Sequence, residues 1–189
     1  LYKGELVPVG IDQEPHLEVA REIAGKLNER FKLDFPQPQR FATKGEYIPS
    51  LTGEGKMSKS VEGSFINLTD SLEEIQAKLA KAPTDSGKGD KVPTEGGVAA
   101  LLKFVELFQG EARMKEYEKQ YTTDGLRYGD LKKELAEAIY KDIEPIQKAR
   151  AEFEGNPELV DKILEEGARK ARAVASKTVE EVKRAMGLL

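Results

Sequence analysis

Two lysines stand three residues apart in the segment 56–60, whose sequence is KMSKS. Serine and methionine separate Lys56 from Lys59, and glycines flank the segment on both sides (Gly53, Gly55 and Gly63). An ammonium group on a flexible four-carbon side chain can follow a polyphosphate that moves during a reaction. A run rich in Lys, Ser and Gly is more often a solvated surface loop. The segment therefore predicts a phosphate-directed loop only where other features support it.

Polar side chains also follow a short apolar run at residues 6–9 (LVPV). The run predicts a buried strand of the kind found in parallel sheets, and Pro8 favours an edge strand or one paired on a single side. Gly10, Asp12 and Gln13 come next, and a helical pattern starts at Glu14 or Pro15 and ends at Phe31. Ligands of open α/β sheets bind at this place, between a strand and the following helix. Asp12 has two interpretations, a helix cap and a ligand contact.

The rest of the chain must position these two groups of residues. Residues 33–49 predict an extended connector with one short strand, and from residue 69 onward the pattern is helical. Ser71 and Glu74 form a capping-box sequence, whereas Asp130 and Asn156 are expected to cap later helices. Pro145 is expected to kink or interrupt the helix that contains it.

Composition excludes several kinds of site. The 189 residues include no cysteine and one histidine, so disulfides, thiolate catalysis, His-based metal sites and a Ser-His-Asp triad are not expected. The formal charge of −4 means that nucleic acid would be bound by a local basic patch. No apolar run approaches the length of a membrane span.

Several motifs together resemble the second half of a class I tryptophanyl-tRNA synthetase of the bacterial type. The matching segments are residues 7–13 (VPVGIDQ), 16–18 (HLE) with Arg21, 56–60, 68–71 (LTDS), 84–86 (TDS), and the stretch 167–188. The KMSKS segment is shared by many class I enzymes and indicates only the class. The run at residues 7–13 followed by HLE favours the tryptophanyl branch, with tyrosyl enzymes as the nearest relatives.

The resemblance implies a fold and a division into domains. It implies an α/β fold, a partial Rossmann-like nucleotide-binding domain, followed by an all-α helical anticodon-binding domain, so that the chain is mostly helical. Residues 1–68, with the KMSKS loop, would end the catalytic domain, and residues 69–189 would form the helical domain. Whether the last helix, about residues 157–187, packs back on the catalytic domain is left open.

The resemblance also implies an activity and its residues. The family activates tryptophan with ATP and Mg²⁺ and transfers it to tRNA(Trp), as a cytoplasmic homodimer. Lys56 and Lys59 would be catalytic, and Val7 and Val9 would line the tryptophan pocket. No residue is assigned as a metal ligand. The implied ATP-binding residues are Gly10, Asp12, Gln13, Lys56, Met57, Ser58 and Lys59.

One departure limits this expectation. Such enzymes begin with a half that carries a His-x-Gly-His motif, which these 189 residues do not contain. The chain is therefore expected to be inactive alone. Two alternatives remain open, a non-catalytic derivative that binds tRNA or protein, and a relative of the tyrosyl enzymes.

Overall fold

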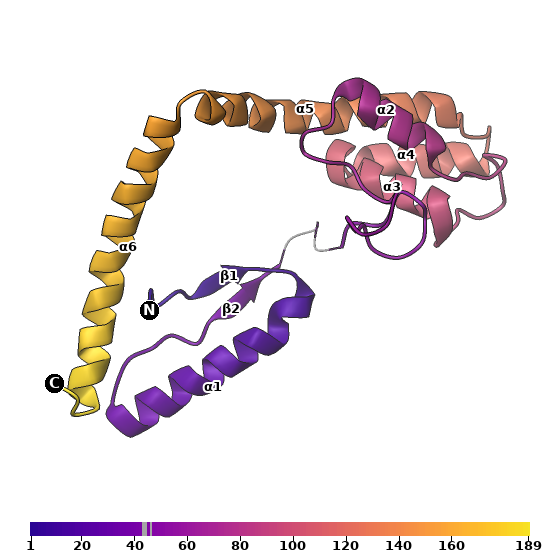
Figure 1. Cartoon of the computed structure of the whole chain (residues 1–189). Coiled ribbons are helices and arrows are strands. Elements are labelled where there is room, and N and C mark those ends of the chain that lie inside the picture. Colours follow the sequence, from indigo (N-terminus) through magenta and orange to yellow (C-terminus); the bar gives the residue numbers. More distant parts are fainter. Residues whose placement is uncertain (43–44, 46) are drawn as a thin grey trace. The chain divides into compact units, whose positions relative to one another are not determined.

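The computed structural model describes residues 1–42, 45 and 47–189. The chain divides into two compact units (Figure 1). Unit one comprises Leu1–Glu46 together with Phe153–Leu189, and unit two comprises Tyr47–Glu152. Each unit has its own packing and is described separately below.

Unit one begins with a strand, a short turn of helix and a long helix. β1 (Leu6–Pro8) leads through the 3₁₀ turn η1 (Ile11–Gln13) into α1 (Glu14–Phe31), as the apolar run and the helical spacing predict. Pro15 lies in the first turn of α1, where its missing N–H costs nothing. The following connector forms β2 (Gln39–Phe41), the one short strand expected there.

β1 and β2 form a two-stranded parallel sheet. Leu6 pairs with Gln39, and Pro8 pairs with Phe41. The expectation that residues 6–9 form a buried strand is wrong for this chain, because Leu6 is 64% exposed and its sheet partner strand ends in a Phe41 that is 52% exposed. Parallel sheets are normally covered on both faces, and two strands with one adjacent helix do not provide that cover.

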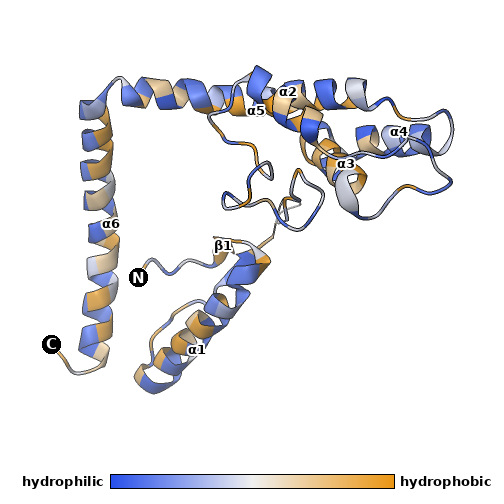
Figure 2. Cartoon of the chain, turned by 45° about the vertical axis from the view of Figure 1, so that its right-hand side comes forward, coloured by the Kyte–Doolittle hydropathy of each residue, from blue (hydrophilic) through white to orange (hydrophobic). Residues whose placement is uncertain are grey.

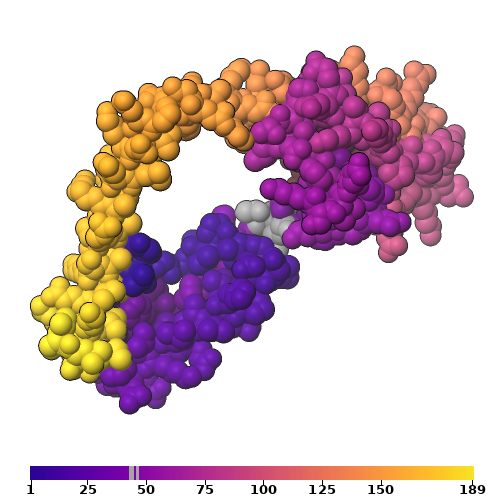
Figure 3. Space-filling model, in the orientation of Figure 1, coloured from indigo at the N-terminus to yellow at the C-terminus, as the bar shows by residue number. Residues whose placement is uncertain are grey.

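α6 (Pro157–Ala185) completes unit one. Asn156 caps it by accepting a hydrogen bond from the Leu159 amide at 3.1 Å, as the Asn-Pro sequence predicts. Hydrophobic and hydrophilic residues alternate along the helix (Figure 2). Its C-terminal part lies against the first residues of the chain (Figure 3), where Lys3 and Glu181 form an ion pair of 3.2 Å and Thr178 is buried.

Unit two contains four helices, which are α2 (Leu72–Lys81), α3 (Gly96–Gln109), α4 (Glu111–Thr122) and α5 (Tyr128–Glu154). The predicted capping box is present, because the Ser71 hydroxyl accepts from the Glu74 amide and the Glu74 carboxylate accepts from the Ser71 amide. Gly110 separates α3 from α4 with φ +92°, a conformation that favours glycine.

The expectation that Asp130 caps α5 is wrong, and so is the expectation that Pro145 interrupts it. The helix begins at Tyr128, so Asp130 lies inside its first turn and does not cap it. The helix also runs without a break through Pro145, which is exposed. A proline inside a helix frees the carbonyl of the preceding turn, and at an exposed position water can bond to that carbonyl.

One hydrophobic core holds unit two together. Leu51 belongs to it, and the partly buried Ile48, Met57 and Ile66 pack against it. Segment 47–68 is therefore packed with the helices of this unit. Its other buried members come from α2 to α5 and their connections: Ile75, Leu79, Ala82, Val98, Leu101, Leu102, Phe104, Val105, Tyr117, Tyr121, Leu126, Leu131, Leu135, Ala136, Ile139 and Ile143.

The fold class is the expected one, a mostly helical chain with a small parallel α/β part at its start. The compact units are divided at residue 46. The predicted boundary between a catalytic and a helical domain at residue 68 is a division by function, and it stays a prediction. Within the described residues, no helix combines the length and the apolar character needed to cross a bilayer.

Candidate functional site

The lysine loop, residues 51–63, is irregular backbone outside any helix. An isolated antiparallel bridge between Pro49 and Lys56 closes its first part, and the Ser50 amide donates to the Gly55 carbonyl at 3.0 Å. Gly53, Gly55 and Gly63 have φ values of +81°, +68° and +75°. Other residues rarely adopt these angles, so the glycines determine the path of the loop.

Gly53 also lies against the start of α3. A Cβ atom placed on Gly53 would be 2.3 Å from the Gly97 nitrogen, and one placed on Gly97 would be 2.0 Å from the Pro83 carbonyl oxygen. Three chain segments therefore meet where only glycine fits. Gly53 thus makes a close packing contact with the start of α3.

The middle of the KMSKS segment is anchored to unit two. The Met57 side chain packs against the hydrophobic core, and its amide donates to the Ile48 carbonyl at 2.9 Å. Ser64, which is 0% exposed, binds both backbone polar groups of Ser58. Its hydroxyl accepts from the Ser58 amide at 3.2 Å and donates to the Ser58 carbonyl at 2.6 Å.

Lys56 and Lys59 flank this anchored pair and are exposed. Among the residues that the structure describes, neither ammonium group has an ion-pair or hydrogen-bond partner. Many other lysines of the chain are paired with carboxylates, such as Lys103 with Glu106 at 2.7 Å. Two unpaired cations on an anchored loop are available to an anionic ligand.

A cavity of about 700 Å³ lies beside the loop. It is bordered by Gly53 and Gly55 of the loop and by the first turns of α3 up to Lys103. Two acidic residues also line it, Glu54 of the loop and Glu95 at the N-cap of α3. Because Gly53 and the first turns of α3 both line the cavity, it lies next to the contact between Gly53 and α3.

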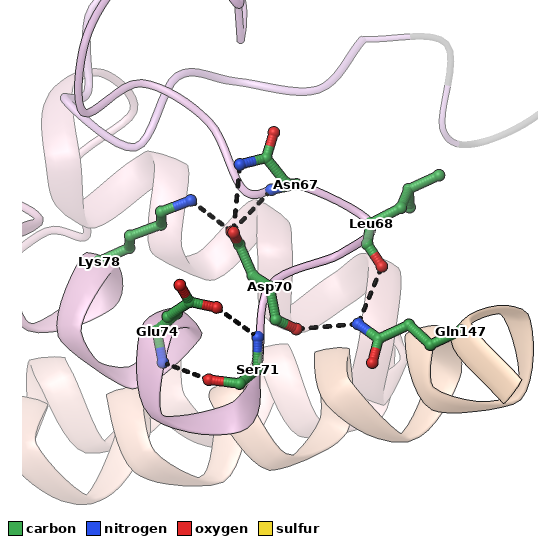
Figure 4. A network of polar contacts seen from close by, with 7 residues as sticks. All are labelled: Asn67, Leu68, Asp70, Ser71, Glu74, Lys78 and Gln147. Carbon is green, nitrogen blue, oxygen red and sulfur yellow. Dashed lines mark hydrogen bonds and ion pairs between the residues drawn. The ribbon is translucent and has the colours of Figure 1, made fainter. Parts of the chain in front are cut away.

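A polar network fixes the chain just after the loop (Figure 4). The buried Asp70 carboxylate accepts from the Asn67 backbone amide at 2.7 Å and from its side-chain amide at 3.1 Å, and it pairs with Lys78 of α2. From α5, the Gln147 side chain donates to the carbonyls of Leu68 and Asp70, both at 2.9 Å. The segment that leaves the loop is thus tied to two helices.

Burial raises the pKa of Asp70, but hydrogen bonds from Lys78 and Asn67 outweigh it and leave the pKa below its usual value. The unfolded chain then binds the proton more readily than the folded chain. Asp70 therefore contributes stability above the ordinary carboxyl pKa, and this contribution is lost as the pH falls through the lowered value.

The substitution Asp70→Asn tests this network. At pH 7 we expect the free energy of unfolding to fall by roughly 1–3 kcal/mol, because the charged hydrogen bonds are lost. The difference from the unmodified chain should shrink as the pH falls from the ordinary carboxyl pKa through the lowered pKa of Asp70. Urea unfolding followed by circular dichroism measures both effects. Asp90→Asn, at an exposed position of the same unit, is the matched control. An equal loss in both variants would contradict the network's role.

The residues Gly10, Asp12 and Gln13 lie in unit one. The Gln13 amide donates to the Gly10 carbonyl at 3.1 Å, which closes the η1 turn, and a Cβ on Gly10 would lie 2.6 Å from an Asp12 carboxylate oxygen. The N-cap of α1 is Gln13, not Asp12, and it makes no side-chain cap bond. Glycine at position 10 therefore leaves room for the Asp12 side chain.

Arg21, part of the sequence resemblance, links the first turn of α1 to the segment just before β2. Its Nε donates to the Pro38 carbonyl at 2.8 Å, and its guanidinium pairs with Glu14 at 2.8 Å. Arg40 of β2 pairs with the same carboxylate at 3.1 Å. The hydrogen bond from Arg21 lowers the pKa of Glu14. The start of α1 is thereby fastened to β2.

Val7 and Val9, the expected tryptophan-pocket residues, are both partly buried. Val7 lines a cavity of about 620 Å³ within unit one, together with apolar residues of α1 and α6, whereas Val9 is not among its lining residues. The assignment of both valines to a tryptophan pocket stays a prediction, as do the assigned ATP contacts.

The structure brings Lys56, Met57, Ser58 and Lys59 together on one anchored loop, while Gly10, Asp12 and Gln13 form a separate turn in unit one. No sequence motif pointed to Ser64 or Gly97. A serine after Gly63 does not by itself indicate a role in the loop, because only the folded chain shows that it is buried and which backbone groups it binds. Within the described part of the chain, no three His, Cys, Asp or Glu side chains gather as a metal site.

Comparisons with known proteins agree with this description. Residues 1–142 match the family described as tRNA synthetases class I (W and Y). A tryptophan–tRNA ligase of Bacillus anthracis is 40% identical over 194 residues, covering 100% of this chain and 58% of the relative. The chain thus spans a little over half the length of such curated relatives.

Solved structures show the same similarity. The tryptophanyl-tRNA synthetase of Mycoplasma pneumoniae has a TM-score of 0.78 at 29% identity, over 100% of this chain and 57% of that one. The enzyme of Campylobacter jejuni, complexed with ADP and tryptophan, has a TM-score of 0.72 at 28% identity, over 99% and 58%. The match over most of the sequence confirms the predicted family, and the chain belongs to the class I tRNA synthetases for tryptophan and tyrosine.

Proposed function

We propose that this chain is part of a tryptophan–tRNA ligase, which activates tryptophan with ATP and transfers it to tRNA(Trp). The observation that carries the proposal is the lysine loop, with two unpaired exposed ammonium groups on either side of an anchored dipeptide. The relatives named as tryptophan–tRNA ligases support the choice of amino acid.

In the first step, a carboxylate oxygen of tryptophan attacks the α-phosphorus of ATP. The bond from this phosphorus to the bridging oxygen breaks, and pyrophosphate leaves. The carboxylate is already ionised at neutral pH, so no general base is required. The barrier is electrostatic, because negative charge accumulates on the leaving pyrophosphate, and fixed cations lower it.

Lys56 and Lys59 would bind the β- and γ-phosphates and stabilise the leaving group. Mg²⁺ would be held mainly by phosphate oxygens, since the described residues offer no cluster of carboxylates for it. Lys59 would act mainly in the transition state. A cation that strengthens its contact as charge develops raises the rate, and not only the affinity.

The other assigned residues would bind the two substrates. Gly10, Asp12 and Gln13 would contact the nucleoside end of ATP, and the backbone at Met57 and Ser58 would approach the adenine side. Val7 and Val9 would line the indole pocket, an apolar role that suits their side chains. The tight Gly10–Gln13 turn supports a close backbone approach to a ligand.

We further propose that residues 1–68 serve catalysis and that residues 69–189 form the domain that binds the anticodon. The enzyme would be a cytoplasmic homodimer. Val19 and Ile23 on α1, each 54% exposed, support an additional protein contact along this helix.

Exchange of labelled pyrophosphate into ATP tests the proposal. The enzyme that contains this chain should show exchange that depends on tryptophan, and much weaker exchange with tyrosine. The 189-residue chain alone should show none. Exchange that depends on tyrosine would favour the tyrosyl alternative. Absence of exchange in a purified protein of about twice this chain's mass would favour the binding derivative.

A further inference from the structure

We propose that Ser64 is a positioning residue for Lys59. Its buried hydroxyl binds both backbone polar groups of Ser58 and so fixes the turn from which the Lys59 side chain projects. This inference rests on the proposed function, because it concerns the same phosphate-directed lysine.

Two consecutive turns connect Ser58 to Ser64. The Val61 amide donates to the Ser58 carbonyl at 3.2 Å, and the Ser64 amide donates to the Val61 carbonyl at 3.2 Å. Lys59 is the second residue of the first turn. Because Ser58 begins that turn, any displacement of its backbone moves the Cα atom of Lys59 as well.

Ser64 links this turn to the core of unit two. Its carbonyl accepts from the Leu51 amide at 3.0 Å, and Leu51 is 2% exposed. Its hydroxyl accepts from the Ser58 amide at 3.2 Å and donates to the Ser58 carbonyl at 2.6 Å. A continuous series of bonds thus runs from the buried core to the residue next to Lys59.

Within the described chain, the side chain of Lys59 has no hydrogen-bond or ion-pair partner. Its position is then determined by the backbone that carries it. A charged group must be preorganised to stabilise charge in a transition state, and the cost of a displaced group appears in the rate. Ser64 supplies this preorganisation without touching ATP itself.

Ser50 provides a matched control. It is 1% exposed, its hydroxyl bonds to the Thr52 hydroxyl at 2.7 Å, and it accepts from the Thr52 amide at 3.1 Å. Ser50→Ala therefore removes a buried hydroxyl and two hydrogen bonds, as Ser64→Ala does, but none of its bonds involves Ser58. Both variants should lose similar stability.

Amide hydrogen exchange on the 189-residue chain tests the contact directly. In the unmodified chain, the Ser58 amide should exchange about tenfold or more slowly than the Lys59 amide, for which the structure shows no acceptor. Ser64→Ala should accelerate exchange at Ser58 by about tenfold, whereas Ser50→Ala should leave it within about twofold. Equal rates at Ser58 and Lys59 in the unmodified chain would overturn the proposal even if a variant fails to fold.

Kinetics of the enzyme that contains this chain tests the consequence. Ser64→Ala should lower kcat for pyrophosphate exchange by about tenfold and leave KM for tryptophan unchanged. Ser50→Ala should lower kcat by less than twofold. If the unmodified enzyme is active and both variants lose the same fraction of kcat, the positioning role of Ser64 is wrong, and the proposed function still stands. An inactive unmodified enzyme with the expected amide exchange would instead overturn the proposed function.

Discussion

Replacing Lys59 with alanine in the enzyme that contains this chain is expected to lower the rate of tryptophan activation by about 10²-fold or more. The ammonium group is exposed and unpaired in the described structure, so its removal breaks no internal contact. The loss should therefore appear in catalysis and not in folding. Tryptophan-dependent pyrophosphate exchange measures the rate, and circular dichroism verifies the fold.

Lys91 offers a control for the removal of charge alone. It is an exposed lysine of the same unit, and the structure shows no partner for it among the described residues. Lys91→Ala changes the net charge as Lys59→Ala does, and exchange should stay within about twofold of the unmodified rate. Near-normal exchange in Lys59→Ala would refute the catalytic assignment of that residue.

Gly97→Ala is expected to destabilise unit two by about 1–3 kcal/mol, the usual cost of forcing an extra methyl group into a packed site. The new Cβ would lie 2.0 Å from the Pro83 carbonyl oxygen and 2.8 Å from the Pro83 side chain. A backbone atom cannot rotate out of the way, so either α3 or the Pro83 segment must move. Urea unfolding of the chain measures the loss.

Gly129 supplies the matched substitution at an open position. It lies in the first turn of α5, and a Cβ placed there would meet no atom within 4 Å. Gly129→Ala should be neutral or stabilise the chain by up to about 1 kcal/mol, because alanine restricts the unfolded chain. If Gly97→Ala proved as stable as Gly129→Ala, the close contact between Gly97 and Pro83 would be wrong.

Local signals predicted much of the fold. The helical spacing of residues 14–31, the capping box at Ser71 and the Asn156-Pro157 start of α6 all appear as expected. Each depends on residues a few positions apart, so a local pattern in the sequence is enough to indicate it. The glycines of the lysine loop are visible in the sequence as well, and their lack of a side chain permits the positive φ angles that the structure shows.

The wrong expectations failed for different reasons. Asp130 resembles a cap, but α5 starts two residues earlier, at Tyr128, and Pro145 is tolerated where water can reach the helix. The strand at residues 6–9 reads as buried because its residues are apolar. Its actual exposure depends on what covers the sheet, which no local pattern encodes.

The sequence by itself determined the family, the order of helices and the two lysines with their flanking glycines, since all of these are encoded by residue type and short spacing. Only the tertiary structure decided that Ser64 binds Ser58, that Gly97 lies between Gly53 and Pro83, and that Asp70 pairs with Lys78. Ser58 and Ser64 are six residues apart and Asp70 and Lys78 are eight residues apart, but only the folded chain shows which groups each of them contacts. Their energy comes from close packing and from satisfying buried polar groups, which depend on three-dimensional position.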